Sequence, residues 1–206
     1  MKILLISAGT KDTGATKRCM LEAKREIERL GQSCECFSLK DEAIASCTGC
    51  NACKSCGRCK HKDRVTELSD KISDFDGYIF FTPVHYGGCS GAMKSALSRL
   101  FYSKKSGLLF KPASAVAVSR RGGNVTALEE ISRFFTFASM PYVCGNYPGI
   151  VHGSSAEEAE KDEEGLQTVR SIASNLVWLI KSISLARLSG IVPSFSEQKL
   201  KTDFIR

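Results

Sequence analysis

The chain carries a series of short apolar segments, each followed by a loop of small or polar residues and then by a helical pattern. Residues 2–7 are the clearest example, because they are apolar without alternation and rich in branched side chains. That pattern is typical of a parallel strand buried on both faces. The expected strands are residues 2–7, 34–39, 77–82, 113–119 and 142–144. Strands that alternate with helices in this way predict an α/β domain with a parallel sheet.

The expected helices are identified by apolar residues that recur at intervals of three and four. One ends before Gly31, one carries Met93 and Leu97, and the others cover residues 65–75, 129–140 and 156–183. A chain of 206 residues is long enough for one such domain with a sizeable core. We expect that domain at residues 1–189, with a cysteine-rich loop at 47–62 inserted and a C-terminal tail at 190–206 that has no assigned role.

Composition excludes several classes of protein. Apolar residues make up 43% of the chain and charged residues 25%, and no window reaches the roughly 18 apolar residues of a membrane span. The net charge of +7 is scattered, without a long basic run, so nucleic-acid binding is not expected. The first apolar run is too short for a signal peptide, and we therefore expect a cytoplasmic protein without a membrane partner.

Five of the ten cysteines lie within thirteen residues at a constant spacing of three. They are Cys47, Cys50, Cys53, Cys56 and Cys59. Thiols crowded in this way oxidise readily unless something ligates them.

Four interpretations of the cysteines remain open on the residues alone. Disulfides are rare in the cytosol, and zinc sites usually need two cysteine pairs separated by a dozen or more residues. A 4Fe-4S cluster suits the spacing, because three thiolates from one tight loop can reach neighbouring irons, with Cys56 or Cys59 as the fourth ligand. Reduced thiols without a metal are the last alternative.

Loops at three strand ends are candidates for binding a ligand. The segment after the first strand contains hydroxyl side chains and opens a helix, an arrangement that favours a phosphate because free backbone amides and the helix dipole point at it. Its hydroxyl residues are Ser7, Thr10, Thr13 and Thr16. The loop lacks the motifs of nucleotide triphosphate and dinucleotide sites, so a monophosphate fits it better.

The second loop, residues 82–91, joins a proline, an aromatic residue and paired glycines at the carboxyl end of a strand, where ligands of doubly wound sheets gather. Tyr86 is able to stack on a flat ring, and Gly87 and Gly88 let backbone amides approach its edge. An ordinary turn is the alternative. The third loop, residues 120–124, follows the fourth strand.

These features together resemble the flavodoxin-like NAD(P)H-dependent FMN reductases, and the compact cysteine run resembles their iron-sulfur flavoprotein branch. The likeness covers residues 1 to about 185. It implies a doubly wound five-stranded parallel sheet in the order 2-1-3-4-5, with helices on both faces and the cysteine-rich loop after strand 2.

The resemblance also implies site residues, with no side chain acting as an obligatory catalytic acid or base. The FMN phosphate would be held by the loop around Ser7, Thr10, Thr13, Gly14, Ala15 and Thr16. The ring would be enclosed by Thr82, Pro83, Val84, His85, Tyr86, Gly87 and Gly88, and flanked by Ser119, Gly122 and Gly123. The 4Fe-4S ligands would be Cys47, Cys50, Cys53 and Cys59, in a Cys-x2-Cys-x2-Cys-x5-Cys pattern that leaves Cys56 as the extra cysteine.

The chain departs from that family at two places. The usual Arg of the phosphate loop is missing, so either FMN binds less tightly or Lys11 or Lys17 replaces the Arg, and His85 stands where a Tyr is usual. The implied function is an FMN-dependent oxidoreductase in which NAD(P)H or a ferredoxin-like donor supplies electrons, and the implied assembly is a dimer or tetramer. A cluster-free electron carrier and a cysteine-based redox sensor are the alternatives.

Overall fold

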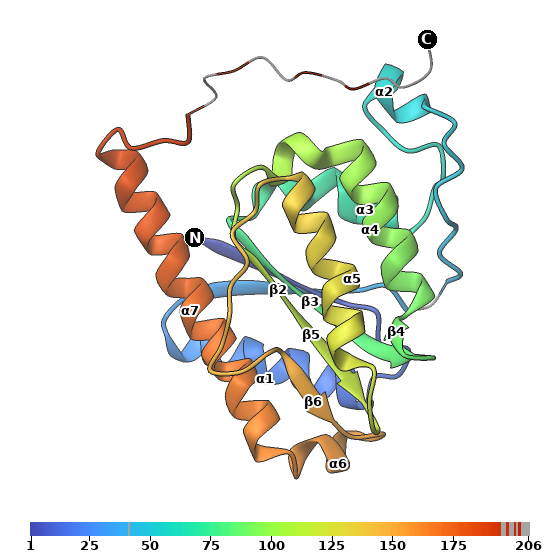
Figure 1. Cartoon of the computed structure of the whole chain (residues 1–206), viewed down its shortest axis with the longest axis vertical. Coiled ribbons are helices and arrows are strands. Elements are labelled where there is room, and N and C mark those ends of the chain that lie inside the picture. Colours follow the sequence, from blue (N-terminus) through green and yellow to red (C-terminus); the bar gives the residue numbers. More distant parts are fainter. Residues whose placement is uncertain (41, 195–196, 198–199, 201, 203–206) are drawn as a thin grey trace.

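The computed structural model describes the whole chain except residues 41, 195–196, 198–199, 201 and 203–206. Its centre is a sheet whose strands run in the order β2-β1-β3-β5-β6 (Figure 1). These parallel strands are β1 Lys2–Ser7, β2 Ser33–Ser38, β3 Gly77–His85, β5 Ala113–Ser119 and β6 Ile150–His152. The two-residue strand β4 Gly88–Cys89 pairs antiparallel with the end of β3. The parallel strands therefore follow the expected 2-1-3-4-5 order, and β4 is an addition that was not expected.

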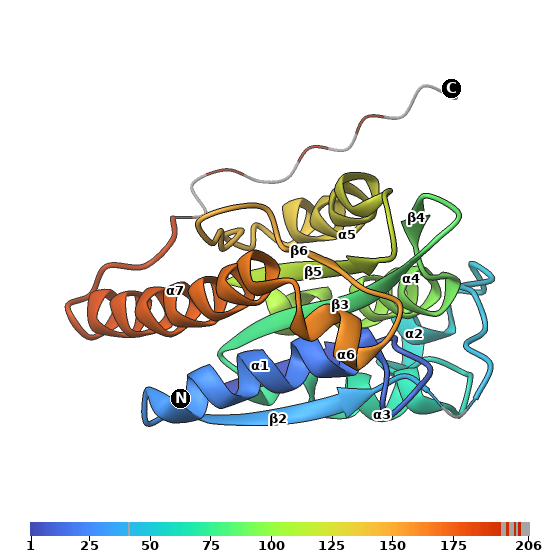
Figure 2. The same cartoon turned by 90° about the horizontal axis from the view of Figure 1, so that it is seen from below.

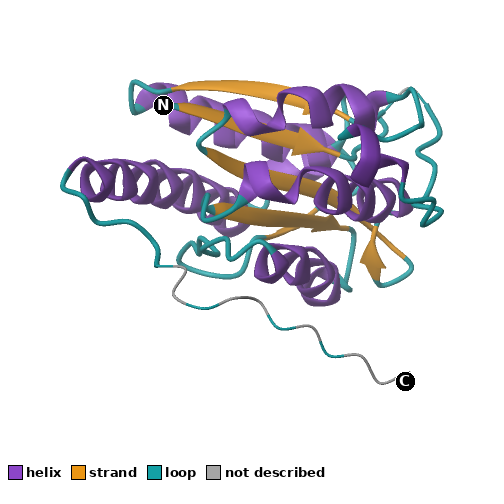
Figure 3. Ribbon diagram, turned by 90° about the horizontal axis from the view of Figure 1, so that it is seen from above, coloured by secondary structure: helices purple, strands orange, loops and turns teal. Residues whose placement is uncertain are grey.

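Helices cover both faces of the sheet, as Figures 2 and 3 show. Alternate residues of β1 pack in opposite directions: Ile3 and Leu5 belong to one buried cluster, and Leu4 and Ile6 to another. The first cluster is closed by α1 Ala15–Arg29, α6 Ala156–Glu160 and α7 Glu163–Leu188. The second is closed by α3 Arg64–Lys71, α4 Gly91–Lys104 and α5 Asn124–Phe137. The expected α/β class with two covered faces is confirmed.

Three short helical turns complete the described structure. They are α2 Ala52–Cys56, inside the cysteine-rich loop, and the 3-10 turns η1 Ile72–Asp74 and η2 Lys105–Leu108. Among the described residues, no helix combines the length and apolar character needed to cross a membrane.

The expected fifth strand at 142–144 is wrong. Tyr142 makes only an isolated bridge with Ala113, after which the chain leaves the sheet and returns as β6 beside the end of β5. Gly149 makes this return possible, because a Cβ there would lie 2.2 Å from the Ala115 carbonyl oxygen. The strand that carries a ligand loop at this edge is therefore Ile150–His152.

Two helix boundaries also differ from expectation. The helix expected at 129–140 begins earlier, at Asn124, and the one expected at 156–183 is two helices. The break falls at Asp162, whose carboxylate accepts a hydrogen bond from the Gly165 N–H at 2.9 Å and so caps α7.

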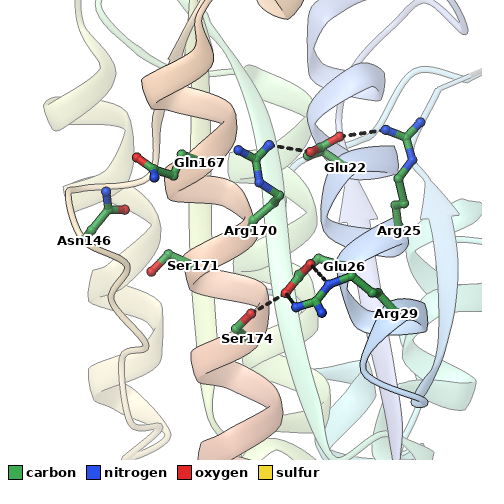
Figure 4. A pocket seen from close by; sticks show the side chains of 9 residues that line it. All are labelled: Glu22, Arg25, Glu26, Arg29, Asn146, Gln167, Arg170, Ser171 and Ser174. Atoms are coloured by element: carbon green, nitrogen blue, oxygen red, sulfur yellow. Dashed lines mark hydrogen bonds and ion pairs between the residues drawn. The ribbon is translucent and has the colours of Figure 1, made fainter.

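A buried charge network joins α1 to α7 (Figure 4). The Glu22 carboxylate, 5% exposed, accepts hydrogen bonds from Arg18, Arg25 and Arg170. Burial raises the pKa of Glu22, but the hydrogen bonds from Arg170 and Arg18 outweigh this effect and lower it. The network fixes α7 against α1 and leaves all of these arginines paired.

Candidate functional site

A cleft of about 220 Å³ lies at the carboxyl ends of the parallel strands. Its walls come from the loops after β1, β3, β5 and β6. The lining residues are Gly9, Thr10, Lys11, Gly14, Ala15, Thr16, Pro83, Val84, His85, Val118, Ser119, Arg120, Gly153 and Ser154. Segments far apart in the chain thus meet at the edge where ligands of such sheets bind.

The loop after β1 presents backbone N–H groups to this cleft. Gly14 is the N-cap of α1 and provides no capping side chain, and the first turn of the helix contains no acidic residue. The Ser7 hydroxyl accepts a hydrogen bond from the Gly9 N–H at 3.1 Å, which shapes the loop. The only carboxylate of the loop, Asp12, is paired with Lys40, whose hydrogen bond lowers the pKa of Asp12. The helix end is therefore open to an anion.

The loop after β3 is a tight β-hairpin, formed by Val84 and His85 pairing with Cys89 and Gly88. Its two turn residues, Tyr86 and Gly87, both have positive φ, of 48° and 82°. That is the geometry of the tight hairpin turns that follow the twist of the strands. Tyr86 is fully exposed at the tip.

The loop after β5 packs directly on this hairpin. Gly123 has φ of 89°, and a Cβ on it would lie 2.6 Å from Gly87 Cα. Below it, the Ser119 hydroxyl donates to Asn124 Oδ1 at 2.6 Å, and the Ser119 carbonyl accepts from the Gly153 N–H at 2.8 Å. The third loop is therefore tied both to the hairpin and to the loop after β6.

Glu130 of α5 anchors the other side of the hairpin. Its carboxylate accepts from the Cys89 N–H at 2.8 Å and from Lys94 Nζ at 2.6 Å. The Lys94 and Cys89 hydrogen bonds lower the pKa of Glu130 to about 2. Burial is the main cause that raises the pKa of Cys89 to about 12, and the hydrogen bond and charge of the Glu130 carboxylate add to it. The Cys89 thiol therefore stays protonated.

Half of the cofactor residues predicted from the sequence line the cleft. They are Thr10, Gly14, Ala15, Thr16, Pro83, Val84, His85 and Ser119. Ser7, Thr13, Thr82, Tyr86, Gly87, Gly88, Gly122 and Gly123 lie outside its lining. Of these, Thr82 is fully buried and its hydroxyl accepts from the Ser90 N–H at 3.0 Å, so it supports the base of the hairpin.

Sequence reasoning did not assign Gly9, Val118, Arg120, Gly153 or Ser154 to the site. Gly153 and Ser154 were missed because the fifth strand was expected too early in the chain. The available signal was the short apolar run at 150–152, followed by small residues and an acidic helix start. Lys11, which was considered as a substitute for the missing Arg, does line the cleft.

A second small hollow lies in the cysteine-rich loop and has a volume of about 20 Å³. Among the residues that line it are Cys47, Cys50, Cys53 and Cys59, whereas Cys56 does not line it. The Cys56 thiol instead hydrogen-bonds to the carbonyls of Ala52 and Arg58, at 3.1 and 3.2 Å. The four cysteines that line the hollow are the four that the family resemblance implies, whereas the spacing alone left Cys56 and Cys59 as alternatives.

The wall of this hollow is formed by α4. Arg99 is only 2% exposed and pairs through two nitrogens with the Asp63 carboxylate, and it also donates to the Ala45 carbonyl at 3.3 Å. Burial opposes the charge of Arg99, but its hydrogen bonds to the Asp63 carboxylate and the proximity of the Cys59 thiol outweigh burial and raise its pKa. Further along α4, the Tyr102 hydroxyl donates to Asn51 Oδ1.

The four thiols do not converge on one point. In the part of the chain that the structure describes, no three His, Cys, Asp or Glu side chains are grouped closely enough to hold a single metal ion. Four zinc ligands would have to lie within about 2.3 Å of one centre. Thiolates that bind separate irons of a cluster do not share this requirement.

The two sites lie at the same end of the molecule. Figures 2 and 3 show the β4 hairpin and the cysteine-rich loop both at the end toward which the strands point. In Figure 1, β4 and α2 of the cysteine-rich loop lie apart from each other on that side of the molecule. Helix α4 starts beside the hairpin, with Ser90 as its N-cap, and reaches the cysteine hollow at Arg99. At 1.5 Å per residue, the path along the helix is roughly 14 Å.

Comparison with known proteins agrees with this geometry. The family described as NADPH-dependent FMN reductase matches residues 1–154. An iron-sulfur flavoprotein of Methanocaldococcus jannaschii is 32% identical over 194 residues, which cover 89% of this chain and 99% of that protein. An iron-sulfur flavoprotein of Archaeoglobus fulgidus is 26% identical and covers 85% of this chain and 96% of its own.

Solved structures share the fold at low identity. A flavone reductase superposes with a TM-score of 0.70 at 19% identity, over 89% of this chain and 64% of that one. An NAD(P)H:quinone oxidoreductase from Methanothermobacter marburgensis has a TM-score of 0.65 at 12% identity, over 86% and 97% of the two chains. An archaeal flavodoxin gives 0.59 at 13% identity, over 88% of this chain and 99% of that one.

Proposed function

The chain belongs to the iron-sulfur flavoprotein branch of the NADPH-dependent FMN reductase family, and we propose that it passes electrons between FMN, a 4Fe-4S cluster and a redox partner. As a member of this family it is an FMN-dependent oxidoreductase. The observation that carries the proposal is the pair of sites at one sheet edge: a cleft with an open helix end, and a hollow lined by four cysteines.

The cleft residues suit a flavin monophosphate. The phosphate would be bound by the first amides of α1 and the Thr16 hydroxyl, with Thr10 and Lys11 at the cleft wall. The ring would lie between Pro83 to His85 on one side and Ser119 on the other. The close packing of Gly123 on Gly87 and Val84 supports this assignment, because it holds the hairpin against the third loop.

FMN, when bound, supplies the hydride and single-electron chemistry. The chain's own residues bind the phosphate, hold the hairpin and shield the ring face at Val84 and Val118. The one ionisable acid–base side chain among the described lining residues other than lysine and arginine is the exposed His85.

The cysteine hollow suits a cluster by its donor set, since four thiolates are the usual ligands of a 4Fe-4S group. The hollow is about the size of one water molecule, so the loop has to expand outward to admit a cluster. Cys47 and Cys50 are exposed and sit in irregular backbone on that outer side, where such movement is least restricted.

Electrons would enter from NAD(P)H or from a ferredoxin-like donor, and a homo-oligomer, as a dimer or tetramer, would bring cluster and flavin of different copies together. The exposed apolar residues Trp178 and Leu185 on α7 support self-association. Light scattering of the purified protein measures the number of subunits in the assembly directly.

The deciding experiment for the cluster is anaerobic purification followed by an absorption spectrum and assays of iron, acid-labile sulfide and FMN. We expect flavin bands above a broad iron-sulfur absorption. Cys59→Ala should lose the iron and keep the FMN, whereas the matched variant Cys56→Ala should keep both.

Flavin without iron in the wild-type protein would contradict the cluster and leave an FMN reductase whose cysteines are a thiol redox site. The phosphate assignment is tested separately by the double variant Ser7→Ala/Thr16→Val. Full FMN occupancy in that protein would exclude this loop as the phosphate site.

A further inference from the structure

We propose that Arg99 is the internal counter-charge of the cluster and donates a hydrogen bond to one of its sulfurs, so that it raises the reduction potential of the cluster. This inference rests on the proposed function. It assigns a role to a residue of α4 that lies 40 positions beyond Cys59 in the chain.

Arg99 is a buried cation at the inner wall of the cysteine hollow. Lys54, Arg58 and Lys60 lie in the cysteine-rich loop itself, but all three are exposed to solvent, where water and salt screen their charge. Arg99 is the only lysine or arginine buried among the described residues. Its charge, and the opposite charge of its ion-pair partner Asp63, therefore act on the hollow through protein rather than through water.

The hydrogen bonds of Arg99 leave one donor free. The two terminal nitrogens bind Asp63, the Ala45 carbonyl and Thr66 Oγ1. The Nε atom is buried and has no hydrogen-bond partner among the described residues. A buried N–H without a partner is costly and is usually satisfied in the complete protein.

A second unpartnered atom points to the same missing group. The Nε2 atom of His61 is also buried without a partner in the described part of the chain, and His61 lines the same hollow. Both nitrogens belong to residues that line the hollow together with four cysteines, so the acceptors that this site itself supplies are sulfur atoms. Cluster sulfides and thiolates are such acceptors, and hydrogen bonds to them are among the factors that set the potential.

The expected direction follows from charge. Reduction adds one electron to a cluster that is already negative, so a fixed buried cation and a donated hydrogen bond stabilise the reduced form more than the oxidised form. Removing either should make the cluster harder to reduce.

The test is a redox titration of the anaerobic holoprotein, followed by electron paramagnetic resonance of the reduced cluster. Arg99→Gln should shift the midpoint potential of the cluster to a more negative value. Arg99→Lys, which keeps the charge and loses the planar donor group, should give a smaller negative shift. The FMN of the same samples provides an internal reference and should not shift.

Two variants separate this role from a structural one. Arg58→Gln removes an exposed charge of the same loop and should leave the potential nearly unchanged. Asp63→Asn breaks the same ion pair from the other side but keeps the cation, so it should shift the potential in the positive direction.

A potential in Arg99→Gln equal to that of the wild type, or equal to that of Arg58→Gln, would overturn the proposal. A negative shift in Asp63→Asn as large as that in Arg99→Gln would overturn it too, because both variants would then act only by loosening the loop. If Arg99→Gln does not retain iron, the shifts of the midpoint potential in Arg99→Lys and Asp63→Asn still test the proposal, because they are expected to have opposite signs. A wild-type protein without iron would refute the cluster itself, and this role for Arg99 with it.

Discussion

At the scale of single residues, two positions outside the cleft hold the hairpin of β3 and β4 in place. Gly123 allows the third loop to touch the hairpin turn, and the Glu130 carboxylate holds the returning strand at Cys89. Neither residue lines the cleft, so their effect on a flavin would be exerted through the position of the backbone.

Gly123→Ala should weaken FMN binding and lower the melting temperature. The substitution combines a left-handed backbone, which costs an L-residue about 1 kcal/mol, with a clash against Gly87. The control is Gly122→Ala, because Gly122 has no positive φ and open space around its Cβ position. Fluorescence titration of FMN into both apoproteins measures the difference, and equal affinities would contradict the role of Gly123.

Glu130→Gln should lose an acid-sensitive part of the stability. The folded-state pKa of about 2 lies below the ordinary value of 4.5, so the contribution of Glu130 is complete above about pH 4.5 and is lost as the pH falls toward 2. The stability difference between wild type and variant, measured by denaturant unfolding, should therefore shrink between pH 5 and pH 3. Glu129→Gln, at an exposed neighbour, is the matched control for the loss of one carboxylate from α5. A difference that stays constant with pH for Glu130→Gln would refute the assignment.

At the scale of elements, α7 is held to the domain by the charge network on α1 as well as by its apolar face. Glu22 accepts from three arginines, one of them on α7, and Glu26 accepts from Ser174 of α7 at 2.6 Å (Figure 4). Glu22 is buried and the Arg18 side chain is only 14% exposed, whereas Arg25 and Arg170 are 72% and 42% exposed, so loss of the Glu22 charge leaves chiefly Arg18 uncompensated inside the protein.

Glu22→Gln should destabilise the protein by about 2–4 kcal/mol, because three guanidinium groups lose a buried carboxylate. Glu28→Gln, on the exposed side of the same helix with a single lysine at 3.6 Å, should change stability by less than about 0.5 kcal/mol. Thermal and urea unfolding of the two variants compare them directly. Similar losses for both would show that the network contributes no more than a surface pair.

A strand could be predicted from the sequence where its burial in the fold leaves a recognisable pattern of apolar residues. β1, β3 and β5 are apolar runs buried in the core, and they were found for that reason. β2 is only partly buried and was found from its loose alternation of polar and apolar residues. β6 has three residues and owes its position to pairing with β5 and to Gly149, neither of which leaves a periodic pattern. Arg99 was equally inaccessible, since its partners Ala45 and Asp63 are 54 and 36 positions away in the chain.

At the scale of the whole molecule, the cleft at the strand ends and the cysteine hollow have no lining residue in common, and only the hollow is lined by α4. Loss of the cluster should therefore leave FMN binding intact. Iron chelation should make the loop sensitive to trypsin at Lys54, Arg58 and Lys60, which are exposed in its turn, while FMN stays bound. Peptide mapping after brief digestion of holoprotein and chelated protein tests this, and release of FMN with the iron would contradict the independence of the two sites.

Both ends of the cysteine-rich loop meet at one guanidinium group, because Arg99 binds the Ala45 carbonyl and the Asp63 carboxylate. The seventeen intervening residues therefore leave the domain and return to nearly the same point. Because the two ends of the segment lie close together, a short linker can replace it without altering the sheet. For the same reason the segment can be inserted into another chain between two residues that lie equally close. The anatomy of this loop thus makes the cysteine-rich segment separable, in evolution or in engineering, from the domain that carries the cleft.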